Sequence, residues 1–194
     1  MDIGCVMQAI LDQTLTLNIV FGTLVFATAA RIYVIPRINE WKPETVLIPI
    51  LLLHSLRHLG LMFLAGGAVF PGMPPQFAWP AAVGDLITAA IAFLAIPVTS
   101  RDFHSARVLL WFFNVFGTLD LIAAITLASI YQAPVHMGAA YWIPAFWVPS
   151  LLVTHYLVFR ILIQRRNERA PFREEEIKTS EVADGGIRLH ISFR

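Results

Sequence analysis

The sequence predicts an all-α, polytopic integral membrane protein: a bundle of five transmembrane helices with its N-terminus outside and its C-terminus in the cytoplasm. Hydrophobic residues make up 57% of the chain and charged residues only 14%, which is too apolar for a soluble domain of this size. Five apolar runs each reach about 20 residues, the length of one helical crossing of a bilayer. Lysine and arginine outside these runs occur only in alternate connections, and this is the pattern that orients membrane helices.

The predicted spans cover residues 15–36, 45–68, 77–98, 107–130 and 140–163. Together they form one transmembrane domain, 1–163, which is followed by a charged tail, 164–194. The first run has no cationic segment before it and follows Asp2 and Asp12, so we expect a retained helix and not a cleaved signal peptide. The single cysteine, Cys5, excludes an intramolecular disulfide and any multi-cysteine metal site.

The distribution of cationic residues predicts the topology. They gather in the first connection, in the third connection and at the start of the tail: Arg31, Arg37, Lys42, Arg101, Arg107, Arg160, Arg165, Arg166 and Arg169. The second and fourth connections, 66–76 and 131–141, contain no Lys, Arg, Asp or Glu. Because cationic loops stay in the cytoplasm, we expect a multi-pass protein of a cell membrane, and of the bacterial inner membrane in particular. The same topology explains the cations, so a nucleic-acid partner is not expected.

Irregular segments are predicted at three places. Pro144 and Pro149 lie inside the fifth run and predict a kink in its outer half. The connection 66–76 is rich in Gly and Pro, cannot extend a helix, and is expected to fold back along the outer membrane surface. The tail has the composition of a solvated, partly disordered segment, but apolar and polar residues alternate over 187–193, as in a strand. A lone strand needs a partner edge, which a second copy of the chain would supply in a homo-oligomer.

Polar residues within the predicted spans are the candidates for function. There are seven: His54, Arg57, His58, Asp85, Asn114, Asp120 and His155. Ionisable groups in a bilayer are costly unless paired, and they commonly mark functional sites. A rise of about 1.5 Å per residue places Arg57, His58 and both aspartates in one layer near the midplane. By the same rule His54 and His155 share a second layer, slightly closer to the cytoplasm.

Charge balance predicts a partner for Arg57. Its guanidinium stays protonated in proteins, so burial near the midplane demands a counter-charge. Asp85 and Asp120 are the only carboxylates at that depth, and we predict that Arg57 pairs with at least one of them. The second carboxylate would then be left for His58, for a proton or for a cation. At 100° per residue, His54, Arg57 and His58 share an arc of about 100°, so this face is expected to look into the bundle.

Helical spacing gives two further expectations. Gly84, Thr88 and Ala92 form a ridge of small residues that lets a neighbouring helix approach Asp85. On the fourth span, Asn114 and Asp120 are about 120° apart around the helix, so they are not expected to line one narrow pocket.

Two functional hypotheses need no cofactor. In the first, the seven polar side chains form a cavity that binds or conducts a small ligand, a proton or a cation, since chains of Asp, His and Arg in membranes often do so. In the second, the network only fixes helix pairing in a structural or assembly subunit. The partners expected are the lipid bilayer and a small ligand or ion.

Two further hypotheses involve a cofactor. His54 and His155 would be the axial ligands of a b-type haem. Alternatively His54 and His58, an i,i+4 pair, would bind a transition metal together with Asp85 or Asp120. Either would make a redox protein or a metalloenzyme. The chain has no Gly-rich phosphate loop, GxSxG or HExxH motif, so no catalytic residue is assigned.

Overall fold

Every regular element in the described part of the chain is helical, as predicted. The computed structural model describes residues 3–167, and the side chains of 13–164. The α-helices are α1 (Ile3–Ala29), α2 (Pro43–Ser55), α3 (Pro75–Arg101), α4 (Phe103–Ile130) and α5 (Val148–Asn167). Shorter elements are the π-helices η1 (Ala30–Val34) and η6 (Ile143–Trp147), and the 3₁₀-helices η2 (Ile35–Arg37), η3 (Leu56–Leu64), η4 (Ala133–His136) and η5 (Gly138–Tyr141).

Five helical stretches are long and apolar enough to cross a membrane. They are Gln13–Arg37, Pro43–Leu64, Pro75–Arg101, Phe103–Ile130 and Gly138–Gln164. Each contains most or all of one apolar run found in the sequence. The helix α5 continues to Asn167, past the predicted start of the tail. The remaining tail, including the alternating segment 187–193, lies outside the described residues.

The third connection is a single residue, Asp102, which ends α3 and caps α4. Its carboxylate accepts hydrogen bonds from the Ser105 hydroxyl at 2.7 Å and from the backbone N–H groups of His104 and Ser105 at 3.0 Å. An acceptor at this position satisfies backbone donors that the first helical turn leaves free. These bonds, with that of the Ser105 hydroxyl the strongest, lower the pKa of Asp102 below its ordinary value.

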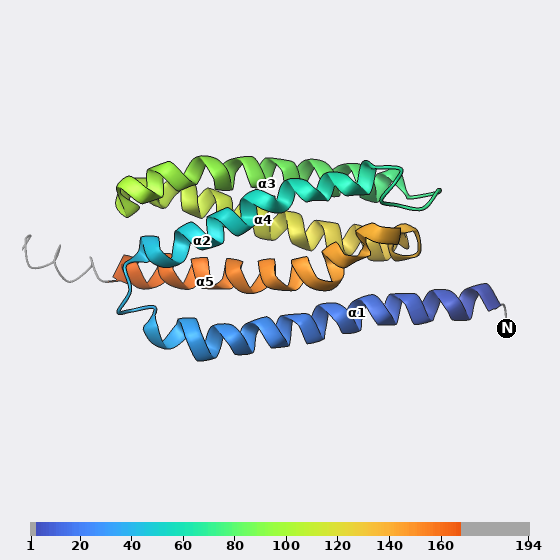
Figure 1. Cartoon of the computed structure of the whole chain (residues 1–194), viewed down its shortest axis with the longest axis horizontal. Helices are drawn as coiled ribbons and strands as arrows, with labels where there is room; N and C mark the ends of the chain where they lie inside the picture. The colour runs from blue at the N-terminus through green and yellow to red at the C-terminus, as the bar shows by residue number, and fades with distance from the viewer. Residues whose placement is uncertain (1–2, 168–194) are drawn as a thin grey trace, which may run out of the picture. The chain divides into compact units, whose positions relative to one another are not determined.

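The helices α2, α3 and α4 pack closely, and α1 lies at the edge of the bundle. Along its length α3 packs against α4, α2 and η3 (Figure 1). The most apolar stretch of the first span is only 6% buried, and among the neighbours of α1 are η6, η4 and α5. At its closest approach a Cβ on Gly22 would lie 2.8 Å from Cγ of Pro149. The chain divides into two compact units, Met1–Phe159 and Arg160–Arg194, and the seven polar candidates all lie in the first.

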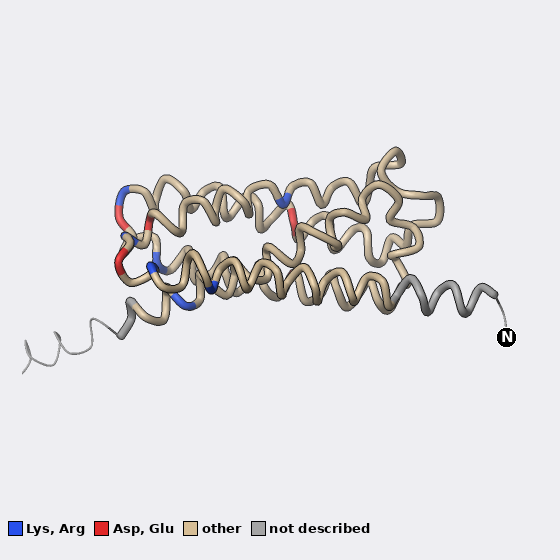
Figure 2. Tube along the Cα trace, turned by 60° about the horizontal axis from the view of Figure 1, so that its bottom comes forward, with Lys and Arg blue, Asp and Glu red and all other residues tan. Residues whose placement is uncertain are grey.

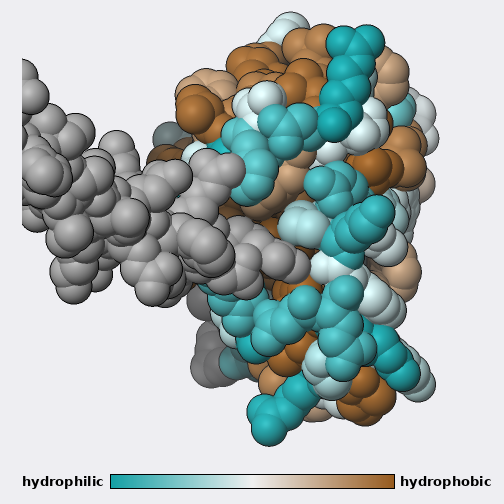
Figure 3. All heavy atoms as spheres, turned by 90° about the vertical axis from the view of Figure 1, so that its left-hand side faces the viewer, coloured by the Kyte–Doolittle hydropathy of each residue, from teal (hydrophilic) through white to brown (hydrophobic). Residues whose placement is uncertain are grey.

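Charged side chains mark one end of the first unit. Among the described side-chain positions of this unit, 13–159, the charged residues gather around the α1–α2 connection and around Asp102, and apart from these there is one central cluster (Figure 2). Hydrophilic side chains cover much of the same end in the space-filling view (Figure 3). We call this the charged end, and the opposite end, formed by the connections 65–74 and 131–142, the uncharged end.

At the uncharged end the two connections are hydrogen-bonded to each other. Phe70 N donates to His136 O at 2.8 Å, and Ala140 N donates to Ala68 O at 3.0 Å. The His136 ring adds a bond from Nδ1 to Pro71 O at 3.2 Å. The connection 65–74 is therefore fixed against the start of the fifth span.

The fifth span is irregular in the half where two prolines predict a kink. Its first turns are the 3₁₀-helix η5 and the π-helix η6, and α5 begins only at Val148. Pro144 lies in η6, while Pro149 lies in the first turn of α5. Because a proline lacks the N–H that continues an α-helical ladder, the regular helix starts after the first of them.

Candidate functional site

A single buried guanidinium holds two carboxylates in the middle of the bundle. Arg57 donates from Nε to Oδ1 of Asp85 at 2.6 Å and from Nη2 to Oδ2 of Asp120 at 2.5 Å. The side chain of Arg57 is 0% exposed, and the two carboxylates are 14% and 13% exposed. Nη1 donates to the carbonyl of Gly117 at 3.2 Å. The predicted pairing of Arg57 is confirmed, and it involves both aspartates.

The second span changes its helical period just before Arg57, and this decides which residues after Arg57 are buried. From Leu56 to Leu64 the chain forms the 3₁₀-helix η3, with three residues per turn. Arg57, Gly60 and Phe63, three residues apart, are the buried positions of η3. Uninterrupted 3₁₀ runs of this length are uncommon and often mark functional segments.

The same change of period corrects the prediction for His58. At 100° per residue His58 would share the buried face with His54 and Arg57, but the 3₁₀ period turns it outward. His58 is exposed, as are Leu61 and Leu64, which follow at intervals of three. Its Nδ1 donates to the carbonyl of Ser55, the last residue of α2, at 3.0 Å. His58 therefore does not belong to the cluster around Arg57.

Three glycines make room for three of the buried polar side chains. A Cβ on Gly60 would fall on the Asp85 carboxylate, and a Cβ on Gly84 would fall on that of Asp120. A Cβ on Gly117 would lie 2.7 Å from Cε1 of His155 and 2.9 Å from Cγ2 of Thr88. The predicted ridge of small residues does bring helices together. Within this ridge, however, Gly84 leaves space for the side chain of Asp120, whereas the space for Asp85 is left by Gly60 on η3.

His155 extends the network from Arg57 to Asn114. Nδ1 of His155 lies 2.7 Å from Oδ1 of Asn114, whose Nδ2 donates to the His155 carbonyl at 3.2 Å. With the amide oriented in this way, His155 must donate from Nδ1, which leaves the lone pair of Nε2 for Nη1 of Arg57 at 3.5 Å. Asn114 and Asp120 thus join one network at separate points, consistent with their wide angular separation.

His54 lies against His155, and one of its ring nitrogens has no partner. The two ring centroids are 4.3 Å apart, and the ring of Phe113 packs on both. The hydroxyl of Thr154 donates to the carbonyl of Ser150, so His54 donates from Nε2 to Thr154 Oγ1 at 2.9 Å. Nδ1 of His54 is then an acceptor, and it is buried with no hydrogen-bond partner among the described residues.

The geometry does not fit a haem held by His54 and His155. Axial imidazoles stand on opposite faces of a porphyrin, with the iron and the macrocycle between them. Here the two ring centroids are only 4.3 Å apart, so the rings are in contact with each other. The two histidines, predicted to share one layer, do lie side by side, but without room for a cofactor between them.

The predicted metal ligands do not converge either. His54 is buried while His58 points outward, so the i,i+4 pair does not present two imidazoles on one face. Among the described side chains, those of residues 13–164, there is no group of three or more His, Cys, Asp or Glu placed to hold a metal ion. Asp85 and Asp120 are both engaged by Arg57.

One small cavity reaches the cluster. It measures about 30 Å³, room for about one water molecule. Its lining comes from α1, η3, α3, α4, the connection 131–142, η6 and the start of α5: Leu15, Ile19, Phe63, Phe77, Asp85, Leu121, Ala124, Ile125, Ala128, Met137, Ile143, Pro144 and Val148. Asp85 is the one polar side chain among them, and the other six predicted site residues do not line this cavity.

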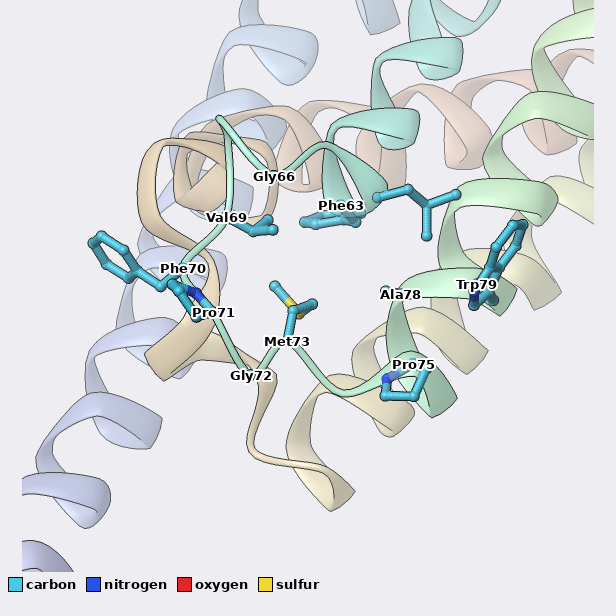
Figure 4. Close-up of a pocket in the computed structure, with 11 residues that line it drawn as sticks. Phe63, Gly66, Val69, Phe70, Pro71, Gly72, Met73, Pro75, Ala78 and Trp79 are labelled. Atoms are coloured by element: carbon cyan, nitrogen blue, oxygen red, sulfur yellow. The ribbon is translucent and has the colours of Figure 1, made fainter.

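A larger pocket lies at the uncharged end and is separate from the cluster. It has a volume of about 350 Å³ between the end of η3, the connection 65–74 and the start of α3. Met73 points into it between Phe63 and Val69, while Phe70 points away (Figure 4). No ionisable side chain lines this pocket.

The protein is an all-α bundle of five long apolar helical stretches around a buried cluster of ionisable side chains. The profile of a family described as "Domain of unknown function (DUF8737)" matches residues 14–163, and every residue of the cluster lies within this range. The chain is therefore a member of that family. Neither a curated protein nor a solved structure matches it.

The close contact at Gly84 gives a direct test of the packing. We expect Gly84→Ala to destabilise the protein by about 1–3 kcal/mol, because the new methyl group overlaps the Asp120 carboxylate. The loss should appear although alanine favours helix formation by about 1 kcal/mol over glycine. Equilibrium unfolding of the purified wild-type and Gly84→Ala proteins measures this difference in the free energy of unfolding. Gly67→Ala is the control, since no atom lies within 4 Å of its Cβ position. Equal stability of the two variants would contradict the packing described.

Proposed function

We propose that this protein spans a cell membrane, in particular the bacterial inner membrane, five times, with its N-terminus outside and its charged end in the cytoplasm. The five apolar helices support insertion, and the separation of a charged from an uncharged end supports the orientation. The Arg57 cluster then lies near the middle of the bilayer.

Reporter fusions test this topology. Fusions at Pro71 and Ala133, in the two uncharged connections, should report an outside location. Fusions at Arg101 and at the C-terminus should report the cytoplasm, because Lys and Arg near these positions resist translocation. A C-terminus found outside would overturn the orientation.

The cluster itself, in our proposal, binds a proton or a small cation. The observation that carries this is its charge: one guanidinium faces two carboxylates, so the cluster has a net charge of −1 when both are ionised. An uncompensated charge among apolar helices is strongly unfavourable. A bound proton or cation would neutralise it, and its arrival or departure would change the charge that Arg57 has to balance.

A structural role is the second candidate, and specific contacts favour it. Arg57 connects η3, α3 and α4 through direct hydrogen bonds, and three glycines fit around the network. Buried networks of this kind can specify helix pairing without binding anything. The two functions differ in one measurable respect, because only the first makes stability depend on proton or cation concentration.

Melting curves of the purified protein distinguish the two functions. A ligand that binds only the native state raises the melting temperature by mass action. If the native cluster keeps a proton that unfolded aspartates release above about pH 4, stability falls as the pH rises. If it binds Na⁺ or K⁺, either salt stabilises the protein relative to choline chloride at equal ionic strength.

Asp85→Asn and Asp120→Asn should each abolish the dependence, because either substitution removes the surplus charge. Asp102→Asn is the matched control, since this carboxylate caps α4 away from the cluster. If the melting temperature of the wild-type protein does not change with pH or with added cations, the structural role is the better account. The same conclusion follows if both cluster variants keep the wild-type dependence of melting temperature on pH or cations.

A further inference from the structure

From the small cavity beside Asp85 we infer that the exchanged cation is a proton, and that it reaches the cluster through this cavity and binds Asp85. This inference rests on the proposed function and names the ligand and its route. The cavity is lined by hydrocarbon on every side except at Asp85.

The chemistry of the lining favours a proton over other cations. Na⁺, K⁺ or a divalent ion gives up its hydration shell only where several oxygen ligands replace it. Around this cavity one carboxylate is the only polar side chain, and the volume of about 30 Å³ leaves no space for a hydrated ion. A proton needs only a water molecule that enters briefly and an acceptor at the end of the path. The cavity provides both conditions.

The position of the cavity gives the direction of exchange. Phe63, Phe77, Met137 and Ile143 line it and also belong to the apolar core beneath the connections of the uncharged end. In the proposed topology this is the outer side of the membrane. Asp120 does not line the cavity. Proton exchange through this route therefore takes place at Asp85 and with the outer side.

The surrounding charges allow one proton to be taken up without breaking the ion pairs. Asp85 on α3 faces the guanidinium of Arg57, which lies on η3. Asp120 on α4 shares the same guanidinium, and Nε2 of His155 on α5 lies beside its Nη1 atom. The residues that α1, η6 and α5 contribute to the cavity are apolar. Oδ1 of Asp85 accepts from Arg57, so the proton transferred from a hydronium ion binds Oδ2 and leaves a water molecule behind. The charge of the cluster rises from −1 to zero.

Variants of the cavity wall test the route. Ala124 lines the cavity, and its neighbour Ala123 is exposed on another face of α4. In a pH-jump experiment on the full-length protein, infrared absorption of the protonated carboxyl group follows proton release. Ala124→Leu should slow release about tenfold or more, because leucine fills the path, while Ala123→Leu should match the wild type. Ile19→Ala, which widens the cavity from α1, should accelerate release.

Two further measurements identify the site and the ion. Asp85→Glu should shift the carboxyl absorption band by more than Asp120→Glu does, because only the protonated residue contributes the band. Titration with Na⁺ or K⁺ at constant pH should not displace the proton.

The outcomes separate the two proposals. The route is wrong if Ala124→Leu and Ile19→Ala both release at the wild-type rate, and the assignment to Asp85 is wrong if the band moves more in Asp120→Glu than in Asp85→Glu. If Na⁺ or K⁺ displaces the proton, the ligand of the cluster is that cation, and the proposed function still holds. A wild-type protein with neither a protonated carboxyl group nor a cation effect would remove the proposed function as well.

Discussion

The burial of Arg57 is the constraint on which the rest of the site depends. A guanidinium cannot lose its charge in a protein, so its place among apolar helices requires carboxylates within hydrogen-bond distance. Asp85 on α3 and Asp120 on α4 meet this requirement. Each carboxylate in turn lies against a residue that has no side chain, which explains why positions 60 and 84 are glycines. Arg57 thereby determines how closely three helical segments approach one another.

Elementary patterns predict the framework and the central ion pairs. Apolar runs of bilayer length predict the five helices, and the one-sided cations predict the two different ends. The pairing of Arg57 follows from charge balance and depth alone, because Asp85 and Asp120 are the only carboxylates near it. The pairing of Arg57 could be predicted because it rests on the energetic penalty of burying charge and on approximate depth, and neither requires the exact direction of a side chain around its helix.

Other parts of the site depend on local geometry that the sequence does not reveal. The prediction for His58 assumes 3.6 residues per turn, whereas η3 has three, and the difference turns this side chain outward. The spacing of Arg57, Gly60 and Phe63 is compatible with a 3₁₀-helix but does not demand one. The contact of His54 with His155 depends on how α2 and α5 pack, and it leaves no room for a haem between the two rings. The predicted metal site fails for another reason, because His58 points outward and Arg57 engages both aspartates.

The central claim is that Arg57 and its two carboxylates act as one charge-coupled unit, and a thermodynamic cycle tests it most directly. Arg57→Met alone leaves two buried carboxylates without a counter-charge and should destabilise the protein by about 3–5 kcal/mol. Adding Asp85→Asn and Asp120→Asn to the same chain should restore much of this stability, because no buried charge then remains. If the three substitutions instead have additive effects, Arg57 is not balanced by these aspartates and the account of the site is wrong.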